Sequence, residues 1–366
     1  MSTTFLPCGV YHENYKQDHA WWQTNFIKSK MLLLFISLFF IIPWVSDTYW
    51  LSICNLIGYT VLGALGVQLL IGFCGQVTLG HGAFLAVGAY VSTLLVLEFP
   101  WPALLVEWGL AYPLSILIAA MAAGFWCVLF GLPSARVKGF YLILTTMAAQ
   151  FITVDFVITQ YVSQIGGRGQ AFSLPLGTIK VGPWVIDTDI KIYYMMIVLT
   201  IICVVGVVNL LRSRVGRAWV AIRDNDISAE VMGINIIKYK LLAFFVAGFI
   251  GGIAGAVWIS NLAAISPEHF PWFLSLWLVG VVLIGGAGSI HGTIFGSIFM
   301  VVVMELLQMA VMPLADTYPK LLFDFLFIKE SAFGLAICLF LIFEPNGLAY
   351  RWWQAKNYFN LWPFSY

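Results

Sequence analysis

Charged residues are scarce in this chain: they make up only 10% of its 366 residues, whereas 61% are hydrophobic. Soluble domains usually carry about 25% charged and roughly 45–50% apolar residues. A surface so poor in charge could not keep the chain in water, and an aromatic content of 16% excludes a disordered chain. Lipid must therefore surround most of the surface.

Other absences exclude several kinds of site. The net charge is +1, without the basic excess that nucleic-acid binding requires. The six cysteines stand singly with no CxxC pair, so neither a zinc site nor a disulfide framework is indicated. No Gly-Lys dipeptide occurs, so the chain has no Walker A loop, and any ATP that drives it must bind another chain. There is also no HExxH or GxSxG sequence, so we expect no catalytic residue, metal or cofactor in this chain.

Long apolar runs predict membrane-spanning helices, which need about 20 residues each. The clearest run, 192–211, has only Thr200 and Asn209 as strongly polar side chains. We expect an all-α, polytopic transmembrane helical bundle of about ten spans, the last of which is the shortest. The expected spans are 31–45, 51–73, 82–97, 111–132, 139–160, 192–211, 241–263, 271–286, 290–312 and 331–343.

The lysines and arginines predict the orientation, because cytoplasmic loops carry an excess of them. With the N-terminus inside, thirteen of the eighteen lie in the cytoplasm, which favours N-in and C-in. The expected organisation is a cytoplasmic N-terminal segment (1–30), a transmembrane domain (31–345) and a cytoplasmic tail (346–366). The transmembrane domain carries an inner loop at 212–240 and an outer, glycine-containing loop at 161–190.

The inner loop contains the signals of a short helix. Asp226 is suited to cap its start, and Gly233 to follow its end. Between them, Ile227 and Val231 share one face, and Glu230 lies nearer the polar side. Such a helix at the membrane surface suits the groove of a soluble partner. The alternative is an ordinary basic loop that obeys the positive-inside rule.

Two glycine-rich breaks interrupt the apolar pattern, at 72–84 and 285–296, and each contains His-Gly followed by phenylalanine. Non-helical backbone at membrane depth is tolerated only inside protein or beside water. The first break therefore suggests a pore-lining or gating segment around Gln76, Thr78 and His81. Two tight cytoplasmic turns with helix-packing glycines are the other interpretation. The paired GxxxG sequences at 248–252 and 251–255 indicate close helix packing.

Polar side chains inside apolar runs are costly in lipid, so they should face the bundle interior or an aqueous path. We count Gln68, Gln150, Asp155 and Glu305 among the candidates for the translocation path, together with the three residues of the first break. Asp155 and Glu305 would need no special role if they lay near the outer interface.

Five segments, 72–90, 136–142, 216–235, 265–270 and 284–292, resemble in order and spacing the LivM-type permeases of branched-chain amino-acid ABC importers. The resemblance covers roughly residues 50–345. It implies that Ala229, Glu230 and Gly233 belong to an EAA-type coupling loop that docks onto an ATPase subunit. The candidate coupling residues are Arg217, Arg223, Asp226, Ala229, Glu230 and Gly233.

The resemblance also implies the assembly and its location. Expected partners are a LivH-like permease, two P-loop ATPase subunits that hold ATP and magnesium, and an external solute-binding protein, in the plasma (inner) membrane of a bacterium. The expected cargo is a branched-chain amino acid, with urea or a short amide as the alternative. An ion-coupled transporter using Asp155 and Glu305 is a rival class. An intramembrane enzyme is disfavoured, because no acid–base or metal constellation appears.

Overall fold

The structure is a computed structural model that describes residues 25–135, 137, 139–162, 164, 172–173, 179–262, 264–317 and 320–361. Most of the predicted N-terminal segment and residues 166–170 of the outer loop lie outside this description. Almost every described element is a helix, so the all-α prediction is confirmed. The first half of the chain forms α2 (Asn25–Ile36), the π-helical turn η1 (Ser37–Ile41), α3 (Ile42–Val45), α4 (Thr48–Gln68), the π-helical turn η2 (Leu69–Phe73), α5 (His81–Leu97), α6 (Ala103–Glu107), α7 (Ala111–Ala135), α8 (Phe140–Phe151) and the π-helical η3 (Ile152–Tyr161).

The second half is also helical, and four strands of two residues each are the exception. The helices are α9 (Asp189–Arg212), α10 (Arg214–Asp224), α11 (Asp226–Val231), α12 (Ile236–Leu262), the 3₁₀ turn η5 (Pro267–His269), α13 (Trp272–Gly285), α14 (Ile290–Thr317), α15 (Lys320–Phe343) and α16 (Gly347–Leu361). Strand β1 (Phe172–Ser173) pairs antiparallel with β4 (Ala264–Ile265), and β2 (Lys180–Val181) pairs antiparallel with β3 (Trp184–Val185).

Among the described residues, eight helices are long and apolar enough to cross a membrane, or nine if α15 and α16, which are bent by 45°, form one span. The expected count of about ten exceeds this for two reasons. Helix α5 is apolar but only 17 residues long. The run at 331–343 is the last part of α15, which passes the test for a span only together with α16. Lys329 and Glu330 lie within α15 and do not end it.

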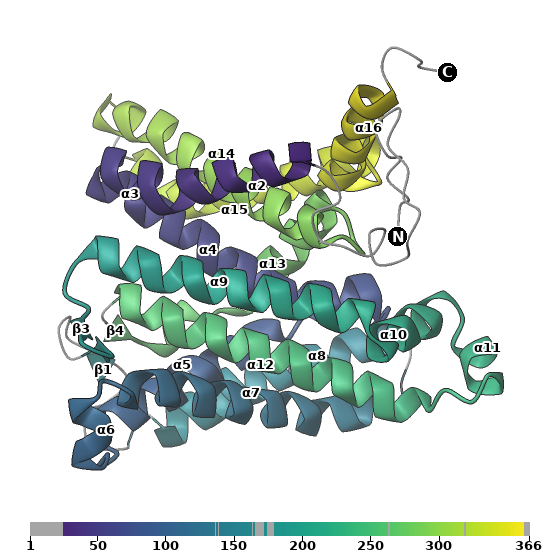
Figure 1. Ribbon diagram of the computed structural model, residues 1–366, viewed down its shortest axis with the longest axis horizontal. Coiled ribbons are helices and arrows are strands. Elements are labelled where there is room, and N and C mark those ends of the chain that lie inside the picture. Colours follow the sequence, from purple (N-terminus) through teal and green to yellow (C-terminus); the bar gives the residue numbers. More distant parts are fainter. Residues whose placement is uncertain are drawn as a thin grey trace.

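Helix α12 is the centre of the bundle and packs against α7, α5 and α4 (Figure 1). Its two GxxxG sequences contact different neighbours. A Cβ added at Gly252 would lie 2.7 Å from the Cβ of Ala123 in α7, and one added at Gly255 would lie 2.0 Å from the carbonyl oxygen of Leu85 in α5. The small residues thus bring two helices into close contact with the central one.

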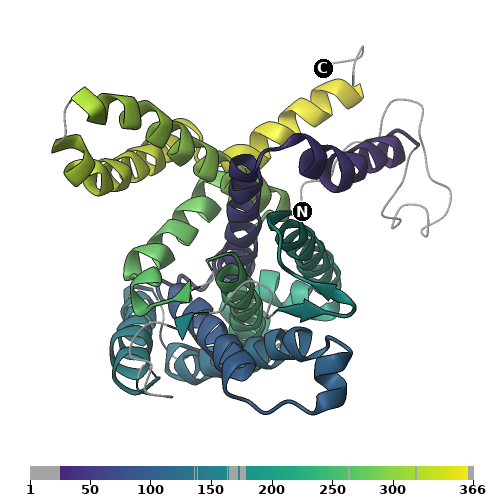
Figure 2. The same ribbon diagram turned by 90° about the vertical axis from the view of Figure 1, so that its left-hand side faces the viewer.

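The remaining helices surround this core. Helix α9 covers α4, and α13 and α14 also pack on α4. Figure 2 shows α2 and the α14–α15 pair extending to opposite sides of the bundle. Arg351 in α16 forms an ion pair with Glu344 at the bend before it.

The two ends of the bundle differ. One end carries the beginning of α2, the connection that contains α10 and α11, and α16; the other carries α6 and the strands (Figure 1). The start of α2, the inner connection and α16 thus lie at the same end of the bundle, as a topology with both termini in the cytoplasm requires. The orientation in a membrane stays a prediction, as do the domain boundaries. The inner connection contains two helices, where we expected one, because residues 214–224 also form α10.

Candidate functional site

Helix α11 begins one residue earlier than predicted. Asn225, not Asp226, is the N-cap: its backbone is extended, and its Oδ1 accepts a hydrogen bond from the Ser228 N–H at 3.1 Å. Asp226 is the first helical residue. Asparagine and aspartate are about equally good caps, so the sequence alone gave no means of choosing between them.

The end of α11 is a Schellman motif around Gly233. The Gly233 N–H donates to the Glu230 carbonyl at 2.9 Å, and the Ile234 N–H donates to the Ala229 carbonyl at 3.0 Å. Gly233 has φ +83°, which side chains resist. A Cβ at this position would meet no described atom within 4 Å, so the need for glycine is a requirement of the backbone alone.

The tip of α11 is apolar and exposed. Ile227, Val231 and Met232 are 69%, 82% and 83% exposed, although they lie on a six-residue helix that projects from the bundle (Figure 1). Ala229 is buried beneath them, and Glu230 is exposed. Large apolar side chains on such a projection are typical of a surface that a partner covers.

Helix α10 holds this projection against the bundle. Its N-cap Ser213 accepts a hydrogen bond from the Val215 N–H at 3.2 Å. Trp219 is fully buried and donates from Nε1 to the carbonyl of Tyr239, near the start of α12, at 2.8 Å. Arg217 is exposed, and its Nη1 donates a hydrogen bond to the Arg212 carbonyl at 3.3 Å. We therefore expect α10 and α11 to move with the start of α12.

The first glycine-rich break, 72–84, contains a non-helical stretch, residues 74–80, between η2 and α5. It runs back into the bundle beside α8: the Leu79 N–H donates to Thr146 Oγ1 at 3.2 Å, and a Cβ at Gly80 would lie 2.0 Å from the Thr146 carbonyl oxygen. Gln76 and Thr78 are buried within it. Protein thus encloses most of this irregular backbone, as membrane depth requires, whereas Gly75 and Val77 are exposed.

The second break, between α13 and α14, packs directly against the first. Gln68 donates from Nε2 to the carbonyls of Gly286 at 3.2 Å and Ser289 at 3.0 Å. A Cβ at Gly72 would lie 2.4 Å from the Gly288 nitrogen. We call the close contact of Gly72, Gly286 and Gly288 the glycine junction. Gln68 therefore stabilises this junction through Nε2, whereas its buried Oε1 has no partner among the described residues. Its place in the translocation path stays a prediction.

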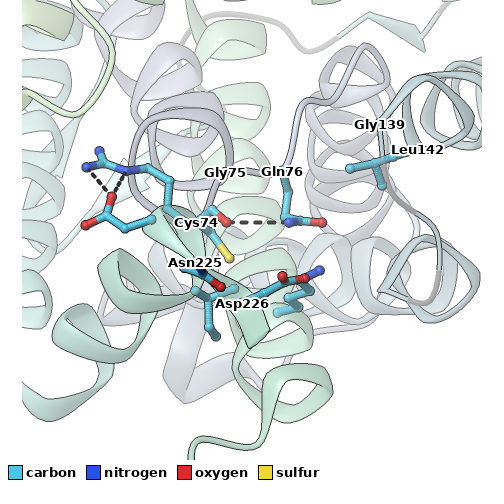
Figure 3. A pocket seen from close by; sticks show the side chains of 11 residues that line it. Cys74, Gly75, Gln76, Gly139, Leu142, Asn225 and Asp226 are labelled. Carbon is cyan, nitrogen blue, oxygen red and sulfur yellow. Dashed lines mark hydrogen bonds and ion pairs between the residues drawn. The ribbon is translucent and has the colours of Figure 1, made fainter. Parts of the chain in front are cut away.

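A pocket of about 340 Å³ opens beside residues 74–76, between the first break, the start of α8 and the α10–α11 corner (Figure 3). Gln76 points into it; its Nε2 is 3.5 Å from the Cys74 carbonyl, and its buried Oε1 has no partner among the described residues. The lining residues are Cys74, Gly75, Gln76, Gly139, Leu142, Ile222, Arg223, Asp224, Asn225, Asp226 and Lys240.

Two more of the predicted path residues lie around the first break. His81 is fully buried between Gly66 and Gly251, and neither ring nitrogen has a partner in the described part of the chain. Gln150 accepts a hydrogen bond from Ser275 at 3.2 Å and donates to the Phe270 carbonyl at 3.0 Å. Ser275 in turn accepts from the Gly82 N–H at 2.8 Å, so Gln150 is tied to the start of α5.

The two acidic candidates lie apart from this group. Asp155 is exposed on η3, and Glu305 accepts a hydrogen bond from Tyr49, near the start of α4 and far along that helix from Gln68.

The functional residues that could not be predicted from the sequence are Thr146 and Ser275, because a single hydroxyl in an apolar run has no recognisable spacing. Among the described residues, no three His, Cys, Asp or Glu side chains are grouped so as to hold a metal ion.

Comparisons with known proteins agree with this architecture. Residues 49–329 match the family described as "Branched-chain amino acid transport system / permease component". The chain is 28% identical over 315 residues to the high-affinity branched-chain amino acid transport system permease protein LivM of Salmonella typhimurium and to that of Escherichia coli, covering 79% of this chain and 67% of each relative. It is 24% identical to the ribose import permease protein RbsC of Haemophilus influenzae over 259 residues, or 68% of this chain and 75% of the relative. No solved structure matches.

The family match covers well over half of the chain, and the helices long enough to cross a membrane fall largely within it. The relatives are transport components of ABC transporters that act on different solutes. This chain is a multi-pass membrane protein and belongs to the family of permease components of branched-chain amino acid transport systems.

Proposed function

We propose that this chain is the membrane subunit of an ATP-driven importer for branched-chain amino acids, coupled to its ATPase subunits through α11. The observation that carries the proposal is the exposed apolar tip of Ile227, Val231 and Met232, held on a capped helix that projects from the bundle. A soluble groove that covers this tip removes apolar surface from water, so docking is favoured.

The cargo is the finer part of the proposal. Several relatives are named for branched-chain amino acids, but others are named for ribose and guanosine. The buried polar groups near the first break include the amides of Gln76 and Gln150, and the pocket beside it also has two basic and two acidic residues, Arg223, Lys240, Asp224 and Asp226. Amides and balanced charges can accompany a zwitterion, which favours an amino acid.

The pocket beside residues 74–76 is the inner end of the path in this proposal. It lies next to irregular backbone, is lined by α10 and α12, and contains an amide oxygen without a protein partner. An orphaned buried acceptor has a desolvation cost, and a passing ammonium group would relieve it. Expected partners are a LivH-like permease, two P-loop ATPases with ATP and magnesium, and an external solute-binding protein.

Uptake into proteoliposomes that contain the complete complex tests this function. With ATP on the ATPase side, we expect labelled leucine to enter and labelled ribose, guanosine, glutamate and urea to stay outside. A complex that lacks the ATPase subunits is the control. Uptake of ribose, guanosine or urea without leucine would overturn the cargo; leucine uptake independent of the ATPases would overturn the coupling.

We further propose that α10 and α11 face the cytoplasm in the plasma membrane. Single cysteines in a cysteine-free background, introduced as Arg214→Cys on α10 and Trp184→Cys on β3, test the topology, because both native side chains are exposed. An impermeant thiol reagent added to intact cells should label position 184 and spare 214 until the membrane is opened. The reverse pattern would contradict the orientation.

A further inference from the structure

Arg223 belongs to α10, and its side chain, which is 37% exposed, reaches from that helix to the backbone of η2. Its Nη1 donates to the carbonyl of Gly72 at 2.6 Å, across 151 residues of sequence. Its methylene stem lies on Gly75, where an added Cβ would be 3.0 Å from Cγ. A Cβ at Gly288 would lie 3.0 Å from Nη1, so this one side chain contacts both glycine-rich breaks.

Asp224 orients the other edge of the Arg223 guanidinium. Nε and Nη2 donate to Oδ1 of Asp224 at 3.1 and 3.0 Å, which leaves Nη1 directed at Gly72. The planar fork of arginine can make both contacts together, whereas the single ammonium of lysine cannot. The hydrogen bond to Gly72 is charge-assisted and therefore stronger than a neutral one.

The glycine junction is close-packed, so the two breaks cannot move independently of each other. The two breaks are in backbone contact at Gly72 and Gly288, and Gln68 bonds the second break to α4. A Cβ at Gly347, the first residue of α16, would lie 2.5 Å from the Gly286 nitrogen. Close-packed backbone transmits displacement instead of absorbing it.

We infer that Arg223 is a positioning residue that links the coupling helix to the glycine junction, so that movement of α11 changes the first break and the pocket beside it. This inference rests on the proposed function, because it requires a partner that moves α11. It assigns Arg223 a role inside the bundle, in place of the contact with the ATPase subunit that the sequence suggested.

The experiment compares Arg223→Ala with Arg223→Lys and with Arg214→Ala in the complete complex in proteoliposomes. Arg214 is the matched control: it carries the same charge and is also exposed, but it lies at the opposite end of α10, where that helix begins. Leucine uptake and ATP hydrolysis are measured in the same sample, and co-purification of the ATPase subunits is measured separately.

We expect Arg223→Ala to assemble and to hydrolyse ATP while leucine moved per ATP falls about tenfold, as loss of one charged hydrogen bond would give. Arg223→Lys should recover part of the loss, and Arg214→Ala should retain the wild-type ratio. An unchanged ratio in Arg223→Ala, or an equal fall in Arg214→Ala, would overturn the inference. If the wild-type complex shows no ATP-dependent uptake, the proposed function fails instead.

A thiol reporter keeps the test decisive if Arg223→Ala does not assemble. Val77 is exposed within the first break, so Val77→Cys in a cysteine-free background reports its accessibility. Trapping the ATPases with ATP and vanadate should change the labelling rate of this thiol when Arg223 is present. The change should be much smaller with Arg223→Lys. Equal changes in both would show that the movement reaches the break without Arg223.

Discussion

Gly233→Val is expected to abolish ATP-driven uptake while leaving the protein inserted in the membrane. Gly233 has φ +83° and donates the hydrogen bond that ends α11. An ordinary residue resists this conformation by about 1–2 kcal/mol, and a β-branched one resists it more. A helix of six residues has few other bonds to hold its end, so the apolar tip would be re-aimed.

Gly233→Asn is the matched control, because asparagine tolerates the left-handed conformation. It should retain most of the uptake, although its side chain is polar and larger than that of glycine. Nothing described lies within 4 Å of a Cβ at this position, so a steric clash within the chain cannot explain a difference between the variants. Membrane insertion is followed by fluorescence-detected size exclusion. Normal uptake by Gly233→Val would remove α11 from the coupling mechanism.

Local signals were sufficient for the features that depend on nearby residues. Apolar runs predicted the long helices, since lipid requires an unbroken apolar segment. Gly233 was predicted to follow α11, because a helix end often needs a positive φ. The start of α11 was wrong by one residue, since Asn225 and Asp226 are both suitable caps. Helix α10 was missed because the positive-inside pattern led us to interpret its charges as those of a loop.

Contacts between residues far apart in the sequence could not be predicted from local signals. Gln68 and Gln150 are polar groups in apolar runs, and the sequence could not tell a lining group from one that binds a neighbouring backbone. The structure places Gln68 at the glycine junction and Arg223 on Gly72, each across more than 150 residues. Such pairings depend on which helices meet, and no spacing in one segment determines that.

The segments that resemble the family meet at two places. Residues from 72–90, 136–142 and 216–235 line the pocket, and the segment 284–292 packs on its neighbour through Gly288. The fifth, 265–270, lies elsewhere: Ile265 pairs with Phe172, and the Phe270 carbonyl accepts from Gln150. Four separate sequence signatures thus serve one end of the bundle, where α11 projects. The fold brings these segments together, so the role of each could not be determined from its own sequence.

The second large effect is expected from Gly88→Val, in the contact between α5 and α12. A Cβ at Gly88 would lie 2.3 Å from the carbonyl oxygen of Gly252 and 2.4 Å from its Cα. Both atoms are backbone, so no side chain can turn aside, and the two helices would have to separate. Overpacking of this kind costs about 3 kcal/mol or more. We expect the thermal unfolding temperature to fall by several degrees and the yield of monodisperse protein to drop.

Gly206→Val is the control that separates crowding from the change of residue type. Gly206 lies on α9, where an added Cβ would meet no described atom within 4 Å, and valine is tolerated on an apolar helix face. That variant should unfold at the wild-type temperature. If Gly88→Val were equally stable, α5 and α12 could not be in backbone contact at this level. The position of His81 and of the first break, which depend on that contact through Gly251, would then have to be revised.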